Sequence, residues 1–188
     1  MIYIGTLVVV ALFAVFVFNN LVTLRNRAKE AWADIEVQLK RRYDLIPNLV
    51  NTVKGYATHE SSAFENVTKA RSAAMGVSAQ IGAGDNLAQK AATENMLSSA
   101  LKSIIAISEA YPELKANTNF LSLQNELSDT ENKIQSARRF YNANVRDLNT
   151  KIESFPSNIL AKFFGFSKME FFDLADNDAA QNPVEVKF

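Results

Sequence analysis

The 188-residue sequence contains no cysteine and a single histidine, and these shortages exclude several kinds of chemistry. Without cysteine there is no disulfide, no thiolate nucleophile, no thiolate zinc site and no lipid-modified cysteine. One histidine leaves no cluster of imidazole ligands and almost no route to a Ser-His-Asp triad. We therefore expect a protein that is not an enzyme, with no catalytic residues, no metal site and no cofactor.

The chain also lacks an excess of charge of either sign and is poor in turn-forming residues. Twenty basic and twenty acidic side chains give a formal net charge of zero, which argues against a nucleic-acid partner. Six glycines and four prolines are too few for a turn-rich β fold. The composition therefore favours an all-α protein.

The first segment lacks charge altogether, from Ile2 to Leu24. As a helix this run would be about 34 Å long, enough to cross the hydrocarbon core of a bilayer. A cleaved signal peptide would carry basic residues before the run and small residues after it, whereas Met1 precedes the run and Phe16-Val17-Phe18-Asn19-Asn20 ends it. Residues 1–24 are therefore predicted to be a transmembrane anchor that is retained.

Basic residues directly after the anchor predict its orientation. Arg25, Arg27 and Lys29 lie at the predicted membrane interface, and no basic side chain precedes the apolar run. The positive-inside rule then places the N-terminus outside and the following domain in the cytoplasm.

Residues 25–156 read as a long antiparallel four-helix bundle that continues directly from the anchor. The predicted helices cover residues 25–57, about 60–78, about 86–110 and 118–155, and they are joined by short connections. Pro47 falls inside the first of them, where we expect a kink near Asp44 and not an end. The last helix carries an apolar residue pattern with alternating steps of four and three, which is a heptad seam.

Two charged residues interrupt that seam, Glu131 and Arg138, and Arg42 interrupts the apolar stripe of the first helix. Buried charges cost several kcal/mol unless they are paired, so we expect these residues, with nearby Asp44, to form a structural polar cluster that fixes helix register. The alternative is a site for an ion or small ligand in the bundle core.

The tail, residues 157–188, is rich in phenylalanine and ends in a strand-like pattern. Phe163, Phe164 and Phe166 lie beside Lys162 and Lys168, a composition that suits the headgroup region of a bilayer, although the rings could instead cap the bundle. Val184, Val186 and Phe188 alternate with charged residues, and we expect this end to pack on a second copy of the chain.

Several motifs in the sequence resemble those of the bacterial LemA family. They are Leu39-Lys40-Arg41-Arg42-Tyr43-Asp44-Leu45-Ile46-Pro47-Asn48-Leu49-Val50, Val53-Lys54-Gly55-Tyr56, His59-Glu60, Ala70-Arg71, Glu131-Asn132-Lys133-Ile134, Ala137-Arg138-Arg139-Phe140-Tyr141-Asn142, Tyr141 to Val145, and Phe155-Pro156-Ser157. The resemblance implies a single-pass protein of the bacterial inner membrane whose remaining part is a helical bundle. It does not imply an enzyme, because the family has no settled biochemical activity, and it leaves the function open.

These observations favour a membrane-anchored helical scaffold or interaction protein that is not an enzyme and associates with itself. Its expected partners are the lipid bilayer, further copies of the chain and other membrane proteins, with no nucleic acid. The alternative is a sensory or ligand-binding bundle that uses the polar cluster.

Overall fold

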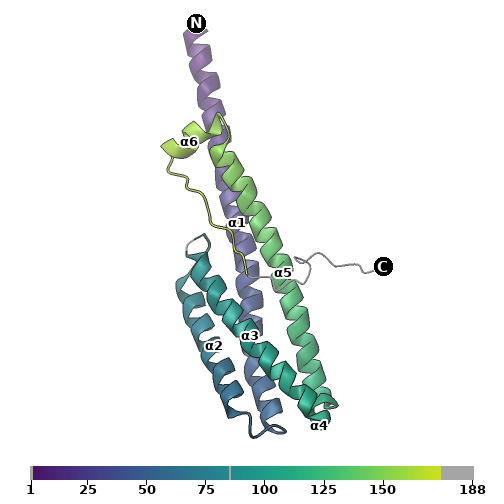
Figure 1. Cartoon of the computed structure of the whole chain (residues 1–188). Helices are drawn as coiled ribbons and strands as arrows, with labels where there is room; N and C mark the ends of the chain where they lie inside the picture. The colour runs from purple at the N-terminus through teal and green to yellow at the C-terminus, as the bar shows by residue number, and fades with distance from the viewer. Residues whose placement is uncertain (1, 85, 175–188) are drawn as a thin grey trace, which may run out of the picture.

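A computed structural model describes residues 2–84 and 86–174, and this part of the chain is almost entirely helical (Figure 1). The helices are α1 (Ile2–Lys54), α2 (Ser61–Gln80), α3 (Leu87–Ala110), α4 (Pro112–Lys115), α5 (Thr118–Glu153) and α6 (Ser157–Phe163). The predicted all-α class is confirmed, with helix bounds close to those expected.

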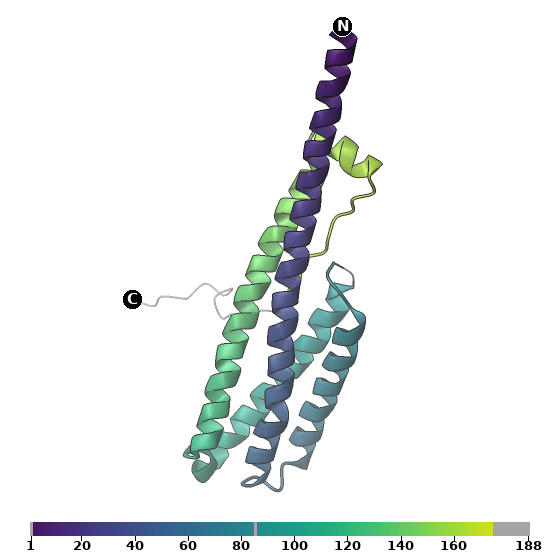
Figure 2. The same cartoon turned by 180° about the vertical axis from the view of Figure 1, so that it is seen from behind.

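Helix α1 is one continuous element of 53 residues that includes the apolar run. Its first part extends beyond the rest of the molecule, as both views show (Figures 1 and 2). Large apolar side chains such as Tyr3, Leu7, Leu12 and Phe16 are exposed there. Helix α1 is long and apolar enough to cross a bilayer. The predicted N-terminal apolar helix, continuous with the domain that follows, is thus present.

The four long helices pack as two pairs. Helix α5 lies along α1 over much of its length, while α2 and α3 form an antiparallel pair. That second pair covers the half of α1 distant from the N-terminus (Figures 1 and 2). Helix α4 connects α3 to α5, and α6 lies beside α1 at the far end of α5.

The core follows the helical repeat predicted from the sequence. The apolar stripe of α1 is buried at Trp32, Ile35, Leu39, Ile46, Leu49 and Val53. The seam of α5 is buried at Leu127, Ile134, Arg138, Tyr141, Val145 and Leu148. The same steps of three and four would extend the two stripes to Tyr56 and Phe155, but both of these residues are exposed. In the middle of the α5 seam, Thr130 is buried and Glu131 is exposed.

After α6 the chain turns at Phe164 and Gly165 and then runs back along α5 as an extended segment; residues 164–174 together form a strap. The Asn149 side chain bonds both backbone groups of Met169, at 2.9 and 3.0 Å. The Asn142 side chain bonds those of Phe172 in the same way, at 3.2 and 2.9 Å. The ring of Phe172 is buried and meets Trp32, with ring centroids 5.3 Å apart. The strand-like ending at residues 183–188 lies outside the described residues.

Pro47 leaves α1 unbroken, since the helix continues to Lys54. A proline has no N–H, so the carbonyl oxygen four residues earlier, on Tyr43, receives no helical hydrogen bond from position 47. Arg71 of α2 supplies a donor instead, and its Nε lies 2.8 Å from that oxygen. A side chain of α2 therefore completes the backbone of α1.

We predict that Arg71→Met destabilises the protein by about 1–2 kcal/mol, because the Tyr43 carbonyl loses its donor. In a Pro47→Ala background the same change should cost about 1 kcal/mol less, since an alanine at this position restores the helical N–H. Urea unfolding of the four combinations measures this coupling. Lys69→Met, at an exposed position of α2, is the control. An equal cost of Arg71→Met in both backgrounds would show that the carbonyl bond is irrelevant.

Candidate functional site: a buried polar layer

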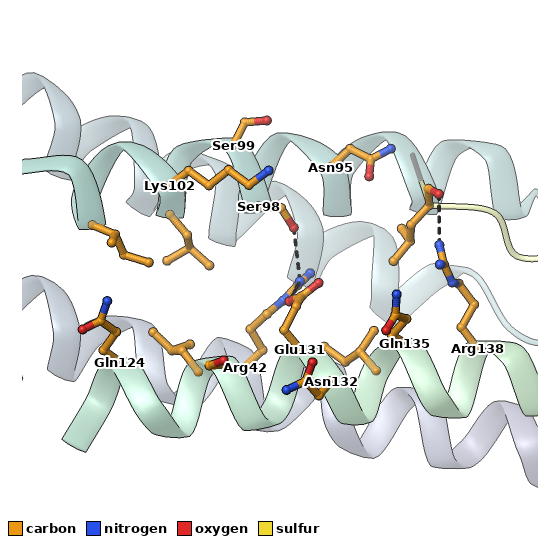
Figure 3. Close-up of a pocket in the computed structure, with 16 residues that line it drawn as sticks. Arg42, Asn95, Ser98, Ser99, Lys102, Gln124, Glu131, Asn132, Gln135 and Arg138 are labelled. Carbon is orange, nitrogen blue, oxygen red and sulfur yellow. Dashed lines mark hydrogen bonds and ion pairs between the residues drawn. The ribbon is translucent and has the colours of Figure 1, made fainter. Parts of the chain in front are cut away.

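Arg42 is the centre of a polar layer that joins three helices. Its guanidinium contacts Glu94 of α3 through Nη2, and its Nη1 lies 2.7 Å from Glu131 Oε2 on α5. The hydroxyl of Ser98 lies 3.3 Å from the same Nη1. Figure 3 shows Arg42 reaching from α1 towards Glu131 and Ser98. The arginine thus binds two carboxylates from two different helices.

Glu94, like Arg42, is fully buried in this layer. Its carboxylate accepts from Arg42 and from the hydroxyl of Tyr43. Burial raises the pKa of Tyr43, and the negative charge of Glu94 raises it further. Burial alone would lower the pKa of Arg42, but the carboxylates of Glu94 and Glu131 outweigh that effect and raise it. The Arg42 guanidinium is therefore held in its charged form by carboxylates from two other helices, and the Tyr43 phenol stays protonated.

Lys90 lies one turn before Glu94 on α3 and is also completely buried. Its Nζ is 4.5 Å from the ring centroid of Trp32 and 3.8 Å from Glu36 Oε1. The indole N–H of Trp32 donates to Glu36 at 2.8 Å. Burial lowers the pKa of Lys90, and Glu36 and Glu94 only partly oppose this. The ammonium is stabilised by a ring face and two carboxylates, and among residues 2–84 and 86–174 it has no direct hydrogen-bond partner.

The structure brings together two of the four residues predicted for the polar cluster. Arg42 and Glu131 are paired, but about half of the Glu131 side chain is exposed, at 51%. Arg138 is buried elsewhere, and its Nη1 donates to the carbonyl oxygen of Leu174 at 2.9 Å. Asp44 is exposed. Two residues correspond to about 200° around a helix, so Asp44 faces away from Arg42 and takes no part in the layer.

Lys90 and Glu94 were not predicted from the sequence, although the pattern that finds them is present. Buried residues of α3 recur with alternating steps of three and four: Leu87, Lys90, Glu94, Leu97, Leu101, Ile104 and Ser108. This is the same heptad repeat that was used for the last helix. Applied to residues 87–108, it would have placed both charges on the buried face.

A cavity of about 510 Å³ opens beside the polar layer, between α3 and α5. Arg42 lies at its base, and Figure 3 shows Ser98 of α3 pointing towards Arg42 and Glu131 across the gap. Leu174 of the strap lines the cavity too. Among residues 2–84 and 86–174, no three His, Asp or Glu side chains gather closely enough to hold a metal ion.

The residues predicted for the membrane interface lie near the end of the apolar part of α1. Phe18 makes edge-on ring contacts with Phe164 and Phe166, at centroid distances of 4.9 and 5.8 Å. The Arg25 guanidinium lies 4.9 Å from the centroid of the Phe166 ring. Phe163 is 80% exposed. Arg27 and Lys29 are exposed on α1 just beyond this group.

Together these features define a class: an all-helical protein with an N-terminal helix of bilayer-spanning length and a polar layer paired within the chain. More specifically, the chain belongs to the LemA family, whose model matches residues 31–188. The resemblance seen in the sequence motifs is confirmed.

The chain is similar to proteins that carry two different names, MamQ and LemA. Magnetosome protein MamQ of Magnetospirillum gryphiswaldense is 28% identical over 89% of this chain and 68% of the relative. Magnetosome protein MamQ 2 of Paramagnetospirillum magneticum is 27% identical, over 96% and 74%. Protein LemA of Metamycoplasma hominis is 24% identical, over 87% and 69%. These relatives and the apolar helix support a membrane-associated helical protein.

We predict that Glu94→Ala destabilises the protein by about 3–5 kcal/mol, because it leaves the buried Arg42 and Tyr43 without their shared partner. Glu126→Ala is the matched control. Its carboxylate is exposed and lies 3.9 Å from Arg41, so its loss should cost less than about 1 kcal/mol. Urea unfolding measures both, and Glu94→Gln gives a milder variant if the alanine protein does not fold. Equal losses for Glu94→Ala and Glu126→Ala would contradict the buried pairing.

The lowered pKa of Lys90 predicts a pH dependence of stability. Between its folded pKa and its ordinary value of 10.5, the unfolded chain binds more protons than the folded one, so stability rises with pH in that window. Tyr43 has the opposite effect, which begins above its ordinary pKa of 10.0. Unfolding free energies measured up to about pH 10 should therefore rise more in the wild type than in Lys90→Met. The exposed Lys102→Met variant should parallel the wild type, whereas a parallel Lys90→Met curve would refute the prediction.

Proposed function

We propose that the protein is a non-enzymatic, membrane-anchored scaffold whose helical bundle stands upright on the bilayer and associates with further copies and other membrane proteins. One observation carries the proposal: large exposed apolar side chains concentrate at one end of the molecule. They lie on the apolar part of α1, on α6 and in the link before α6, at Tyr3, Leu7, Leu12, Phe16, Phe155, Ile159 and Phe163. An exposed apolar surface of this kind is suited to contact with lipid.

The length of α1 supports an upright arrangement. Residues 2–24 would cross the hydrocarbon core, and residues 25–54 would continue for about 45 Å beyond it. The turn between α1 and α2, and α4 beside it, would then lie far from the membrane surface (Figure 1). A bundle of this shape offers long helical faces to partners at a fixed distance from the bilayer.

Helix α6 would provide a second contact with the membrane. Ala161 of α6 packs in one small cluster with Val17 and Leu21 of α1, which are within the last two turns of the apolar run. The exposed rings of Phe155 and Phe163 would therefore lie at the depth where the hydrocarbon meets the headgroups. Arg25, stacked on Phe166, would mark the aqueous side of that boundary.

The orientation of the protein in the membrane is proposed from the basic residues at the same end of the molecule. The exposed basic residues Arg25, Arg27 and Lys29 support a cytoplasmic bundle with the N-terminus outside. The relatives support a membrane location, and within this proposal the membrane is the bacterial cell membrane.

The internal pairing of the polar layer supports a structural role over the alternative of a ligand-binding or sensory bundle. Arg42 already contacts two carboxylates, and Glu94 already accepts from two donors. A ligand would have to displace these partners or use the neighbouring cavity. Relatives that carry the names of different systems, MamQ and LemA, also favour a shared structural part over one shared reaction.

We predict that a nitroxide attached at Phe163→Cys in the full chain, in liposomes, lies at headgroup depth. It should collide more with oxygen than with a water-soluble nickel complex, because oxygen concentrates in lipid. The matched control is Leu121→Cys, an exposed apolar position at the opposite end of the bundle, which should show the reverse preference. The chain has no native cysteine to interfere. Water-like collisions at both positions would contradict a membrane role for α6.

In intact bacteria, Leu121→Cys should also resist a membrane-impermeant maleimide until the membrane is permeabilised.

We predict that the full chain, purified in lipid nanodiscs or mild detergent, has the native mass of a defined homo-oligomer. Native mass spectrometry checks this, and a Phe163→Ser variant tests whether α6 contributes to assembly. A strictly monomeric mass at working concentrations would remove self-association from the proposal and leave the anchored bundle.

A further inference from the structure

The end of the molecule that holds the apolar run and α6 carries an excess of positive charge. Residues 2–30 and 146–168, which form this end, contain seven basic and three acidic side chains. The whole chain has twenty of each, so the rest of it has a matching excess of acidic side chains. The neutral chain thus concentrates positive charge at the end that bears the exposed apolar side chains.

Much of this positive charge has no partner within the described chain. Glu153 is paired with Lys168 at 2.7 Å. By contrast, no hydrogen bond or ion pair within residues 2–84 and 86–174 involves the side chains of Arg25, Lys29 or Lys162. All three residues are exposed. These cations are therefore available to an anionic partner.

Arg25 is held on an aromatic surface. Phe18, Arg25 and Lys29 fall within about 40° of one another around α1, because they are spaced by seven and four residues. The rings of Phe164 and Phe166 contact Phe18. The Arg25 guanidinium lies over the Phe166 ring, 4.9 Å from its centroid. The ring positions the guanidinium through a cation–π contact, and the N–H groups meet no carboxylate in the described part of the chain.

A guanidinium positioned in this way is suited to binding phosphate. Its planar set of N–H donors matches two oxygens of a phosphate group, and a nearby lysine adds charge without a fixed geometry. In a bilayer the lipid phosphates lie just outside the hydrocarbon core, and Arg25 is the first charged residue after the apolar run. Arg25 would therefore lie at the depth of the phosphates.

We propose that Arg25 binds the phosphate of an anionic phospholipid, with Lys29 on the same face of α1 and Lys162 on α6 adding positive charge. This proposal rests on the anchored arrangement proposed above. The acyl chains of the lipid would contact α6, where Ile159 and Phe163 are exposed. A soluble anion would leave these side chains in water, so lipid is the favoured source of the phosphate. A zwitterionic headgroup would bring a cation of its own to an end that is already basic, so a net negative headgroup is preferred.

The test measures the lipid selectivity of the full chain in phosphatidylcholine bilayers. Electron spin resonance separates spin-labelled lipid whose motion the protein restricts from lipid in the bulk bilayer. Spin-labelled phosphatidylglycerol should associate about three-fold more strongly than spin-labelled phosphatidylcholine. Arg25→Gln should remove about half of that preference or more, because it removes the phosphate ligand. Arg25→Lys should have an intermediate effect, since it keeps the charge but loses the planar donors.

Arg27→Gln is the matched control. Arg27 is exposed and has the same charge as Arg25. It lies only about 3 Å further along α1, but about 160° away from Arg25 around the helix. Because it faces away from the aromatic surface, its loss should lower the preference by less than about a quarter, through net charge alone.

Three outcomes would overturn the proposal. Equal association of the two lipids with the wild type would show no preference for anionic headgroups. Equal losses for Arg25→Gln and Arg27→Gln would show an effect of net charge and no site. Loss of the preference on addition of inorganic phosphate, but not of sodium chloride at the same ionic strength, would make free phosphate the ligand.

The same spectra keep this proposal separate from the proposed anchoring. The total amount of restricted lipid reports anchoring by α1, and it should be the same in the wild type and in all three variants. Restricted lipid without a preference for phosphatidylglycerol would refute the lipid site alone. A chain that restricts neither lipid would refute the anchoring as well.

Discussion

The pairing of Arg42 constrains how the helices of this protein pack. A buried guanidinium is costly unless carboxylates surround it, and here one comes from α3 and the other from α5. Sliding either helix by one turn, about 5.4 Å, would move its carboxylate out of reach. Apolar residues of similar size tolerate such a shift more easily, so the charges select one register where leucine seams alone would allow several.

The strap depends on the same layer. Phe172 rests on Trp32, and Trp32 in turn contacts Tyr141 and the Lys90 ammonium. Glu170 of the strap accepts from the backbone N–H of Leu87, at the first turn of α3. The strap thereby joins α1, α3 and α5 just above the Arg42 layer, where the α2–α3 pair would otherwise be held mainly by its own contacts.

The sequence predicted what depends on helical period and missed what depends on tertiary partners. The apolar run, the α1 stripe and the α5 seam were visible because each follows a repeat. Asp44 was misplaced because closeness in sequence was weighed above its angular position on the helix. Lys90 and Glu94 could have been found from the α3 repeat. Asn142 and Asn149 could not, because their partners are backbone groups of a segment without any periodic pattern of its own.

Two routes connect the apolar end of the molecule with the region of the polar layer: α1 itself, and α6 together with the strap. A single membrane-spanning helix leaves a domain free to rotate about the helix axis. Here α1 continues without a break from the apolar run to Arg42, and α6 is fixed to the same stretch through Phe18 and Leu21. From α6 the strap returns to Trp32, whose ring contacts the Lys90 ammonium beside the polar layer. The position of α6 on α1 and the register of the helices are therefore coupled, because the same short segment, residues 164–174, contacts α1 at one end and is hydrogen-bonded to α5 along the rest.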